Sequence, residues 1–262
     1  MTTLALTAAA VTGLLWAGML PASAADTEAG GPPAPAAASA LRVMPLGDSI
    51  TDGIGSSTGN GYRGPLWDEL SAQGYSLDFV GTSRAGSMPD PDNEGHSGWR
   101  IDEIASITDA SLSRYRPNVV TLMIGTNDLG QDYEVPTAPD RLDSLIDQVV
   151  ADAPDATVLV ASLTISTNPT IEANRGGYNQ RIPGMVEEKQ AAGKHVSYVD
   201  MGALTADDLA DGLHPDDAGY QKMADAFNSG IRAADAAGWI GEPVPIEGQV
   251  GSGTAGTYAG AL

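Results

Sequence analysis

The chain has 262 residues, 42% of them hydrophobic, which is enough for one folded core of roughly 200 residues with additional ends. Its 34 Asp and Glu residues outnumber 13 Lys and Arg, so the formal net charge is −21. A field of that sign repels nucleic acid and anionic membranes but not neutral sugars, although solubility alone would also explain it. The chain has no cysteine, which excludes disulfides, thiolate metal sites and cysteine nucleophiles.

The first 24 residues have the pattern of a secretory signal peptide. Leu4–Leu20 is mostly apolar, and Pro21–Ala24 supplies the small residues of a cleavage site. We therefore expect cleavage near Ala24, a secreted mature protein that begins at Ala25, and no stable membrane association. This segment contains no Lys or Arg, so the usual positive start is absent, and an uncleaved anchor is the alternative.

The composition of the remaining chain changes twice. Residues 25–40 are rich in Pro, Ala and Gly and have little to bury, which predicts a disordered linker. Residues 41–240 carry the periodic apolar patterns of one folded domain. Residues 241–262 are Gly-rich without helical or strand period, which predicts a flexible tail.

Strand-like apolar runs alternate with helix-like segments through the domain. We predict strands over Arg42–Leu46, Leu77–Val80, Asn118–Ile124, Thr157–Leu163 and His195–Val199. We predict helices over Leu66–Gln73, Ile101–Tyr115, Asp140–Ala151, Tyr178–Ala192 and Pro215–Ala237. Because these strands read as buried on both faces, the pattern predicts a three-layer α/β/α sandwich around a parallel sheet of about five strands. Reactive groups of such folds gather after the carboxyl ends of the strands.

Ser49 directly follows the first predicted strand, in the sequence Gly47-Asp48-Ser49-Ile50. A serine there can place its hydroxyl at the sheet edge and its N–H at a helix start, where negative charge is favoured. From this segment alone a helix N-cap is the better explanation. The G-x-S-x-G elbow is absent, because Thr51 stands at its last glycine position.

A serine nucleophile needs a base, and the chain has three histidines. His195 falls inside a predicted strand, which indicates a structural role, and His96 lies in a loop that could border a pocket. His214 precedes the last predicted helix, and Asp211, three residues upstream, is close enough to accept its Nδ1–H. An ordinary surface turn is the alternative for this pair.

Two further strand ends carry groups that could stabilise an oxyanion. Gly81 ends the second predicted strand and allows close approach of a ligand to the backbone. Asn127, in Gly125–Asp128 after the third strand, could supply an amide N–H. A simple turn is the alternative for this second segment.

Together these segments resemble the four ordered blocks of SGNH (GDSL-type) hydrolases, over about residues 41–238: Gly47–Ile50, Gly81, Gly125–Asp128 and Asp211–His214. The resemblance implies the flavodoxin-like fold of that family and a catalytic triad of Ser49, His214 and Asp211. It also implies an oxyanion hole formed by the N–H groups of Ser49 and Gly81 and the amide of Asn127. The implied chemistry passes through an acyl-enzyme and needs no metal and no organic cofactor. The fourth residue of the first block is Ile50, whereas the GDSL pattern after which the family is named has leucine there.

Two more segments, Gly61–Trp67 and Glu94–Arg100, resemble acetylxylan esterases of carbohydrate esterase family three, in which they are loops around the active site. From these two segments we predict that Tyr62, His96, Trp99 and Arg100 contact the substrate. Asp48, next to Ser49, is a further predicted contact. Core packing is the other explanation for Trp99 and the better one for Trp67. With two phenylalanines in the chain and no exposed apolar loop, we expect a short acyl group such as acetate.

The segment Asp90–Glu94 is acidic and could offer oxygen ligands to calcium. It lacks the spacing of an EF-hand loop. We therefore expect a solvated loop and no metal site.

The leading hypothesis is a monomeric secreted serine esterase that removes acetyl groups from plant polysaccharide such as acetylated xylan. The second is a lipid-directed or general carboxylesterase, such as a lysophospholipase, on the same scaffold. The third is a carbohydrate-binding module that keeps the fold without catalysis. A peptidase is the least favoured enzyme, because nothing in the sequence suggests a peptide-binding groove.

Overall fold

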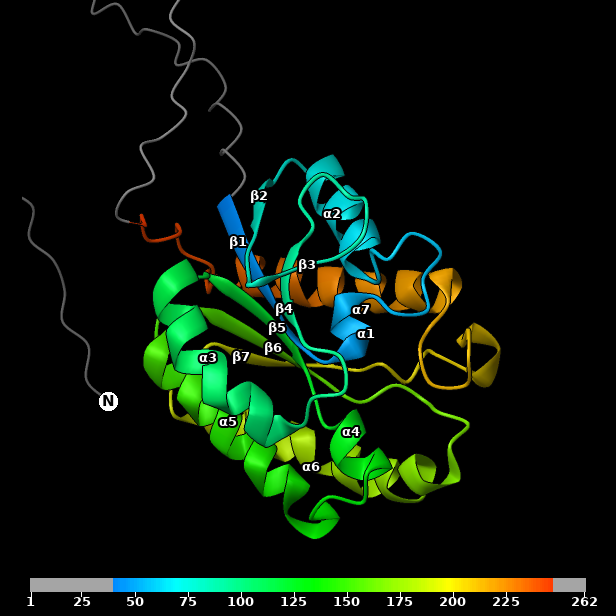
Figure 1. Cartoon of the computed structure of the whole chain (residues 1–262). Coiled ribbons are helices and arrows are strands. Elements are labelled where there is room, and N and C mark those ends of the chain that lie inside the picture. The colour runs from blue at the N-terminus through cyan, green and yellow to red at the C-terminus, as the bar shows by residue number, and fades with distance from the viewer. Residues whose placement is uncertain (1–39, 247–262) are drawn as a thin grey trace, which may run out of the picture. The chain divides into compact units, whose positions relative to one another are not determined.

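The computed structural model describes residues 40–246 (Figure 1). The predicted signal peptide, the predicted linker up to residue 39 and the tail from residue 247 lie outside the described residues. All described residues belong to one unit of the chain, Ala38–Leu262.

The described residues form a single sheet of seven strands. In chain order the strands are β1 (Ala40–Gly47), β2 (Ser76–Phe79), β3 (Ser83–Arg84), β4 (Asp92–Gly95), β5 (Val119–Met123), β6 (Thr157–Ala161) and β7 (Val196–Val199). Strands β2, β1, β5, β6 and β7 run parallel in that spatial order. These are the five strands that the sequence predicts. Strand β4 also pairs in parallel with β1, and β3 pairs with β4 in antiparallel fashion.

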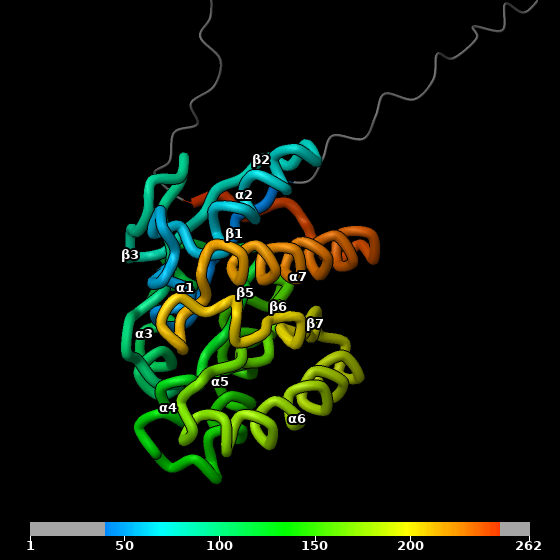
Figure 2. Tube along the Cα trace, turned by 90° about the vertical axis from the view of Figure 1, so that its right-hand side faces the viewer, coloured from blue at the N-terminus to red at the C-terminus, as the bar shows by residue number. Residues whose placement is uncertain are grey.

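Seven α-helices lie within the described residues: α1 (Ser49–Asp52), α2 (Arg63–Ala72), α3 (Ile101–Tyr115), α4 (Thr126–Gly130), α5 (Ala138–Asp152), α6 (Pro169–Ala191) and α7 (Asp217–Ala236). Helices α3, α5 and α6 cover one face of the sheet, and α2 and α7 cover the other (Figures 1 and 2). Short 3-10 turns occupy Val135–Thr137 and Ala206–Asp208. The predicted α/β/α sandwich is confirmed. No helix of residues 40–246 is long and apolar enough to cross a membrane.

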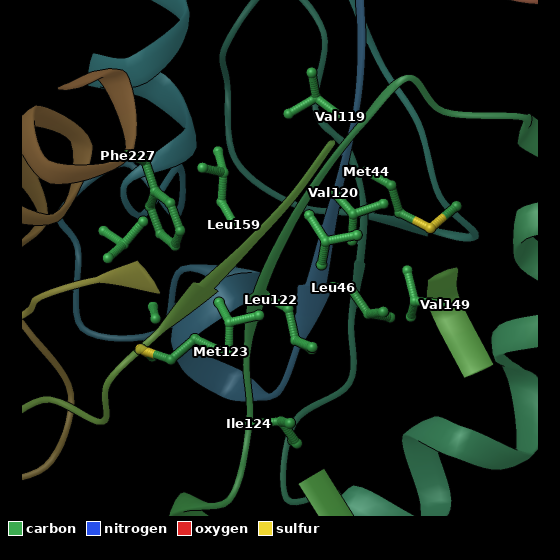
Figure 3. Packing of buried hydrophobic residues seen from close by; sticks show 14 of the residues in the cluster. Met44, Leu46, Val119, Val120, Leu122, Met123, Ile124, Val149, Leu159 and Phe227 are labelled. Carbon is green, nitrogen blue, oxygen red and sulfur yellow. The ribbon is translucent and has the colours of Figure 1, made fainter. Parts of the chain in front are cut away.

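The core is built around the two central strands. Every residue of β5 and β6 is buried, as expected for strands covered by helices on both faces. Phe227 of α7 and Val149 of α5 approach these strands from opposite faces, and both are fully buried (Figure 3). This rigid centre fixes where the carboxyl ends of β1 and β5 lie, and with them the segments that follow.

The starts of helices α6 and α7 differ from the prediction. Helix α6 begins at Pro169 rather than Tyr178, because the Asn168 side chain caps it by accepting from the N–H groups of residues 170 and 171. Pro183 lies inside this helix. Helix α7 begins after its N-cap Asp216, so Pro215 precedes the helix.

The last described residues are held against the sheet. The carbonyls of Gly241 and Val244 accept hydrogen bonds from the side chains of Asn118 and Arg42, at 2.7 and 2.8 Å. The predicted flexible tail therefore does not begin at residue 241, because polar side chains at the start of β1 and β5 bind its first residues.

Candidate active site

Ser49 lies where β1 ends and α1 begins, at the carboxyl end of the sheet (Figure 1). Gly47 permits this tight passage, because a Cβ atom there would lie 2.3 Å from the Met123 carbonyl oxygen of β5. Asp48 is the N-cap of α1, and its Oδ1 accepts from the Ile50 N–H at 3.0 Å. The capping role therefore belongs to Asp48, which leaves the Ser49 hydroxyl free for other partners.

The structure brings Ser49, His214 and Asp211 into one chain of hydrogen bonds. Ser49 Oγ lies 2.9 Å from His214 Nε2, and His214 Nδ1 lies 2.7 Å from Asp211 Oδ2. The side chain of His214 is 14% exposed and that of Asp211 is 53% exposed. A hydroxyl, an imidazole and a carboxylate in this order form the arrangement in which the ring can take the hydroxyl proton.

Asp211 is bound tightly by the turn that carries His214. Its Oδ1 accepts from the backbone N–H groups of His214 at 2.8 Å and Leu213 at 3.0 Å. Partial burial raises the pKa of Asp211, but these bonds and the bond from the imidazole outweigh it and hold the pKa below its ordinary value. The carboxylate is therefore ionised at neutral pH and suited to stabilise an imidazolium.

The turn is held in place from both sides. Gly212 has a φ of 84°, a left-handed conformation that favours glycine, and its carbonyl accepts from the Thr167 N–H at 2.7 Å. Gly55, in the loop after α1, packs so closely on the turn that a Cβ atom there would lie 2.8 Å from His214 Cβ. The segments of the base and the nucleophile are thus packed directly together.

The predicted oxyanion donors lie in tightly packed backbone. Gly81 accepts no side chain, because a Cβ atom there would lie 2.0 Å from the carbonyl carbon and oxygen of Asn93. Within residues 40–246, the N–H groups of Gly81 and Ser49 donate to no protein acceptor. The Asn127 amide nitrogen lies 2.9 Å from the Trp99 carbonyl and 3.5 Å from Asp48 Oδ2. Asp48 therefore links the segments of Ser49 and Asn127.

Burial of Asp48 affects how stability depends on pH. Its side chain is fully buried, and this burial raises the pKa of the carboxyl from 3.8 to about 6. Between those pH values the native state keeps a proton that the unfolded state has lost. The free energy of unfolding therefore falls as the pH rises through this window and remains lower above it. About two pKa units correspond to about 3 kcal/mol.

Asp48→Asn should accordingly be more stable than the wild-type protein at pH 8, by up to about 3 kcal/mol, and equally stable at pH 4. Asparagine keeps an oxygen that can cap α1 and removes the buried charge. Urea unfolding of both proteins at the two pH values measures the difference, with the exposed Asp68→Asn as control. An equal difference at both pH values would contradict a native Asp48 pKa near 6.

The predicted substrate contacts are only partly accessible. The prediction for Tyr62 is wrong: its ring is fully buried against Phe227, and its hydroxyl bonds to Thr121 Oγ1 at 2.9 Å. Asp48, also fully buried, can act on a substrate only through its neighbours. The burial of Tyr62 and Asp48 could not be predicted from the sequence, because both residues stand between glycines and polar residues.

The other predicted contacts are partly buried. His96 stacks on Trp99 with ring centroids 4.3 Å apart. Arg100 lies over the Tyr133 ring and donates to Gln131 Oε1 at 2.8 Å. Whether these three side chains touch a substrate stays a prediction.

Two structural assignments from the sequence agree with the packing. Trp67 packs against the core, edge-on to Phe79. His195 stacks on Trp239, in the segment that follows α7.

The acidic segment Asp90–Glu94 is not a solvated loop, contrary to the prediction. Its second half belongs to β4, and both Asn93 and Glu94 are fully buried. Asp90 Oδ2 accepts from the Phe79 N–H at 2.8 Å. No group of three or more His, Cys, Asp or Glu side chains within residues 40–246 is arranged to hold a metal ion.

Sequence reasoning missed two buried polar residues near the site. Asp128, in the same segment as Asn127, accepts from the Ile101 N–H at 3.1 Å and from Arg141 at 2.7 Å. Arg63 is fully buried and donates to backbone carbonyls. Its place between Tyr62 and Gly64 gave no periodic signal of burial.

Comparison with known proteins gives the family. Residues 46–222 match the model of the GDSL-like Lipase/Acylhydrolase family. The solved structure of a Clostridium thermocellum family 3 carbohydrate esterase is 37% identical, with a TM-score of 0.69, and covers 77% of this chain and 100% of that one. The solved structure of an acetyl esterase mutant with an acetate ion is 27% identical, with a TM-score of 0.66 over 75% of this chain and 99% of that one.

A curated relative, a multidomain esterase of Ruminococcus flavefaciens, is 29% identical over 218 residues, which are 71% of this chain and 28% of the relative. The chain thus spans less than two thirds of the curated relatives it matches, 28% and 55% of their lengths. The family match covers more than half of the chain, and the solved relatives share its fold over their whole length. The chain therefore belongs to the GDSL-like (SGNH) lipase/acylhydrolase family of carboxylic ester hydrolases.

Proposed function

We propose that this protein is a secreted serine esterase that removes acetyl groups from plant polysaccharide such as acetylated xylan, with Ser49, His214 and Asp211 as its triad. The observation that carries the triad is the continuous hydrogen-bond chain, 2.9 Å from serine to histidine and 2.7 Å from histidine to aspartate. Secretion rests on the sequence pattern of residues 1–24 alone.

The geometry suits acyl transfer in two steps. His214 takes the Ser49 proton as Oγ attacks the ester carbonyl, and Asp211 stabilises the imidazolium that forms. The N–H groups of Ser49 and Gly81 and the amide of Asn127 would hold the oxyanion. The imidazolium then protonates the departing alkoxide. In the second step His214 activates a water molecule, which releases acetate and restores the serine.

The choice of substrate rests on the relatives and on the surface. Similar solved proteins include a family 3 carbohydrate esterase and an acetyl esterase mutant with an acetate ion. The net charge of −21 does not oppose a neutral sugar. Among the described residues, the large hydrophobic side chains that stand exposed are Ile54 and Val244. Two isolated apolar side chains give little surface for a long acyl chain, which favours a short one.

Acetate release from acetylated xylan tests the proposal, with Ser49→Ala protein as the blank. The wild-type protein should release acetate and should hydrolyse aryl acetate faster than aryl butyrate or longer esters. A preference for butyryl or longer esters, without release from xylan, would instead support a general carboxylesterase. Retained turnover in clean Ser49→Ala protein would overturn the triad itself.

A further inference from the structure

A carboxylate is buried in β4 beside the candidate active site. The side chain of Glu94 has no exposed surface, and that of its neighbour His96 is 18% exposed. Burial of a carboxylate costs several kcal/mol unless hydrogen bonds compensate it. The cost indicates that this carboxylate has a specific task in the fold.

Within residues 40–246, the hydrogen-bond partners of the Glu94 carboxylate belong to two segments. Its Oε2 accepts from the Thr82 N–H at 2.9 Å, and its Oε1 accepts from Thr82 Oγ1 at 2.6 Å. His96 Nε2 lies 2.7 Å from the same Oε1. Burial raises the pKa of Glu94, but the bonds from His96 and Thr82 outweigh it and hold the pKa below its ordinary value. Glu94 is therefore an anion that accepts three hydrogen bonds.

The segment that Glu94 binds includes the predicted oxyanion glycine. Thr82 directly follows Gly81, and both the N–H and the hydroxyl of Thr82 are anchored on the one carboxylate. On the other side, Gly81 packs on the carbonyl of Asn93, the residue before Glu94. The Gly81 N–H direction is thus fixed between two contacts with β4.

His96 connects the same carboxylate to the other two predicted donors. Its backbone N–H donates to the Gly47 carbonyl at 2.9 Å, at the end of the strand that leads to Ser49. Its ring stacks on Trp99, whose carbonyl accepts from the Asn127 amide at 2.9 Å. Glu94 and His96 therefore contact the segments of Gly81 and Ser49, and they reach Asn127 through Trp99.

We propose that Glu94 and His96 are positioning residues that hold the three oxyanion donors in register. The proposal rests on the proposed esterase function and deepens it. Glu94 does not touch the substrate. Its contribution is to keep the Gly81 N–H aimed where charge develops in the transition state, an interaction that affects kcat more than ground-state binding.

Two substitutions of Glu94 test this. Glu94→Gln keeps the length and one acceptor oxygen, and Glu94→Leu removes both acceptors. Because removal of one oxyanion donor costs about 100- to 1,000-fold, a displaced donor should lower kcat by about 10-fold in the first variant and about 100-fold in the second. KM for an aryl acetate should stay within about twofold of the wild-type value. Asp92→Asn is the matched control and should keep the wild-type kcat: Asp92 lies on the same strand as Glu94, and its side chain pairs with Arg84 of β3.

The rate is divided by the number of sites that a fluorophosphonate labels at completion, so that unfolded protein does not count. A wild-type kcat per labelled site in Glu94→Gln and Glu94→Leu would overturn the proposal, as would a raised KM with kcat unchanged. If Glu94→Leu fails to fold, Glu94→Gln alone decides. Ser49→Ala distinguishes failure of the positioning role from failure of the proposed function. If Ser49→Ala is inactive and the Glu94 variants are fully active, the positioning role is rejected and the esterase function stands. If Ser49→Ala is active, the proposed function itself is rejected.

Discussion

Ser49→Ala is expected to lower kcat by about 100,000-fold, and Ser49→Ala combined with His214→Ala should lose no more than Ser49→Ala alone. The reason is that the hydroxyl and the ring act as one unit across the 2.9 Å between Oγ and Nε2. Without the hydroxyl there is no nucleophile for the ring to activate. Initial rates with an aryl acetate, measured on the single and double variants, give both numbers.

The control is His195→Gln, because this histidine stacks on Trp239 and has no bond to the triad. It should keep the wild-type kcat. Both triad variants should also keep the wild-type circular dichroism spectrum, since alanine leaves the backbone hydrogen bonds of Ser49 and His214 in place. Losses that multiply in the double variant would mean that the two residues act independently, against the triad.

The central strands and several helices could be predicted from the sequence because their side chains are apolar. Strands β5 and β6 read as continuous buried runs, and α3 spans the predicted residues, Ile101–Tyr115. The full length of α6 could not be predicted from its hydrophobic period, because Gly176, Gly177 and Pro183, which are unfavourable in helices, lie inside it. Asn168 followed by Pro169 is nevertheless a sequence pattern typical of a helix start.

The residues of the proposed triad could also be predicted, because they lie in one turn or follow a predicted strand. Asp211 and His214 are three residues apart in one turn, and Ser49 follows β1 at once. The structure adds the distance that the sequence could not give, since Ser49 and His214 are 165 positions apart.

Buried polar side chains are what the sequence could not predict. Strand β4 reads as Asp-Asn-Glu-Gly, yet Asn93 and Glu94 are fully buried. Their hydrogen-bond partners come from other segments, so no local pattern distinguishes them from a solvated loop. Tyr62 shows the same difficulty: its ring, predicted to contact a substrate, is buried in the core, where its hydroxyl bonds to Thr121.

Arg63 is the largest of these buried polar residues, and its guanidinium joins the loops around the site. It donates to the five carbonyls of Thr51, Asp52, Gly59, Ala85 and Pro91, at 2.9 to 3.1 Å. Burial lowers the pKa of Arg63, although arginine remains charged. A planar group with five donors fits this set of carbonyls, and no other side chain has that many.

Arg63→Met should therefore lower the free energy of unfolding by about 4 kcal/mol or more, because methionine fills the space but removes the guanidinium donors of the Thr51, Asp52, Gly59 and Ala85 carbonyls. The Pro91 carbonyl still accepts from the Ala85 N–H and the Asn93 amide. Arg63→Lys should lose about half of that, since an ammonium has three donors and a different geometry. Urea unfolding at pH 7 measures both. Arg84→Met is the matched control: this exposed side chain pairs with Asp92, and its loss should cost less than about 1 kcal/mol. If Arg63→Met were as stable as Arg84→Met, these four carbonyls would be satisfied without the guanidinium, and the loops that surround Ser49 would be held by their own packing.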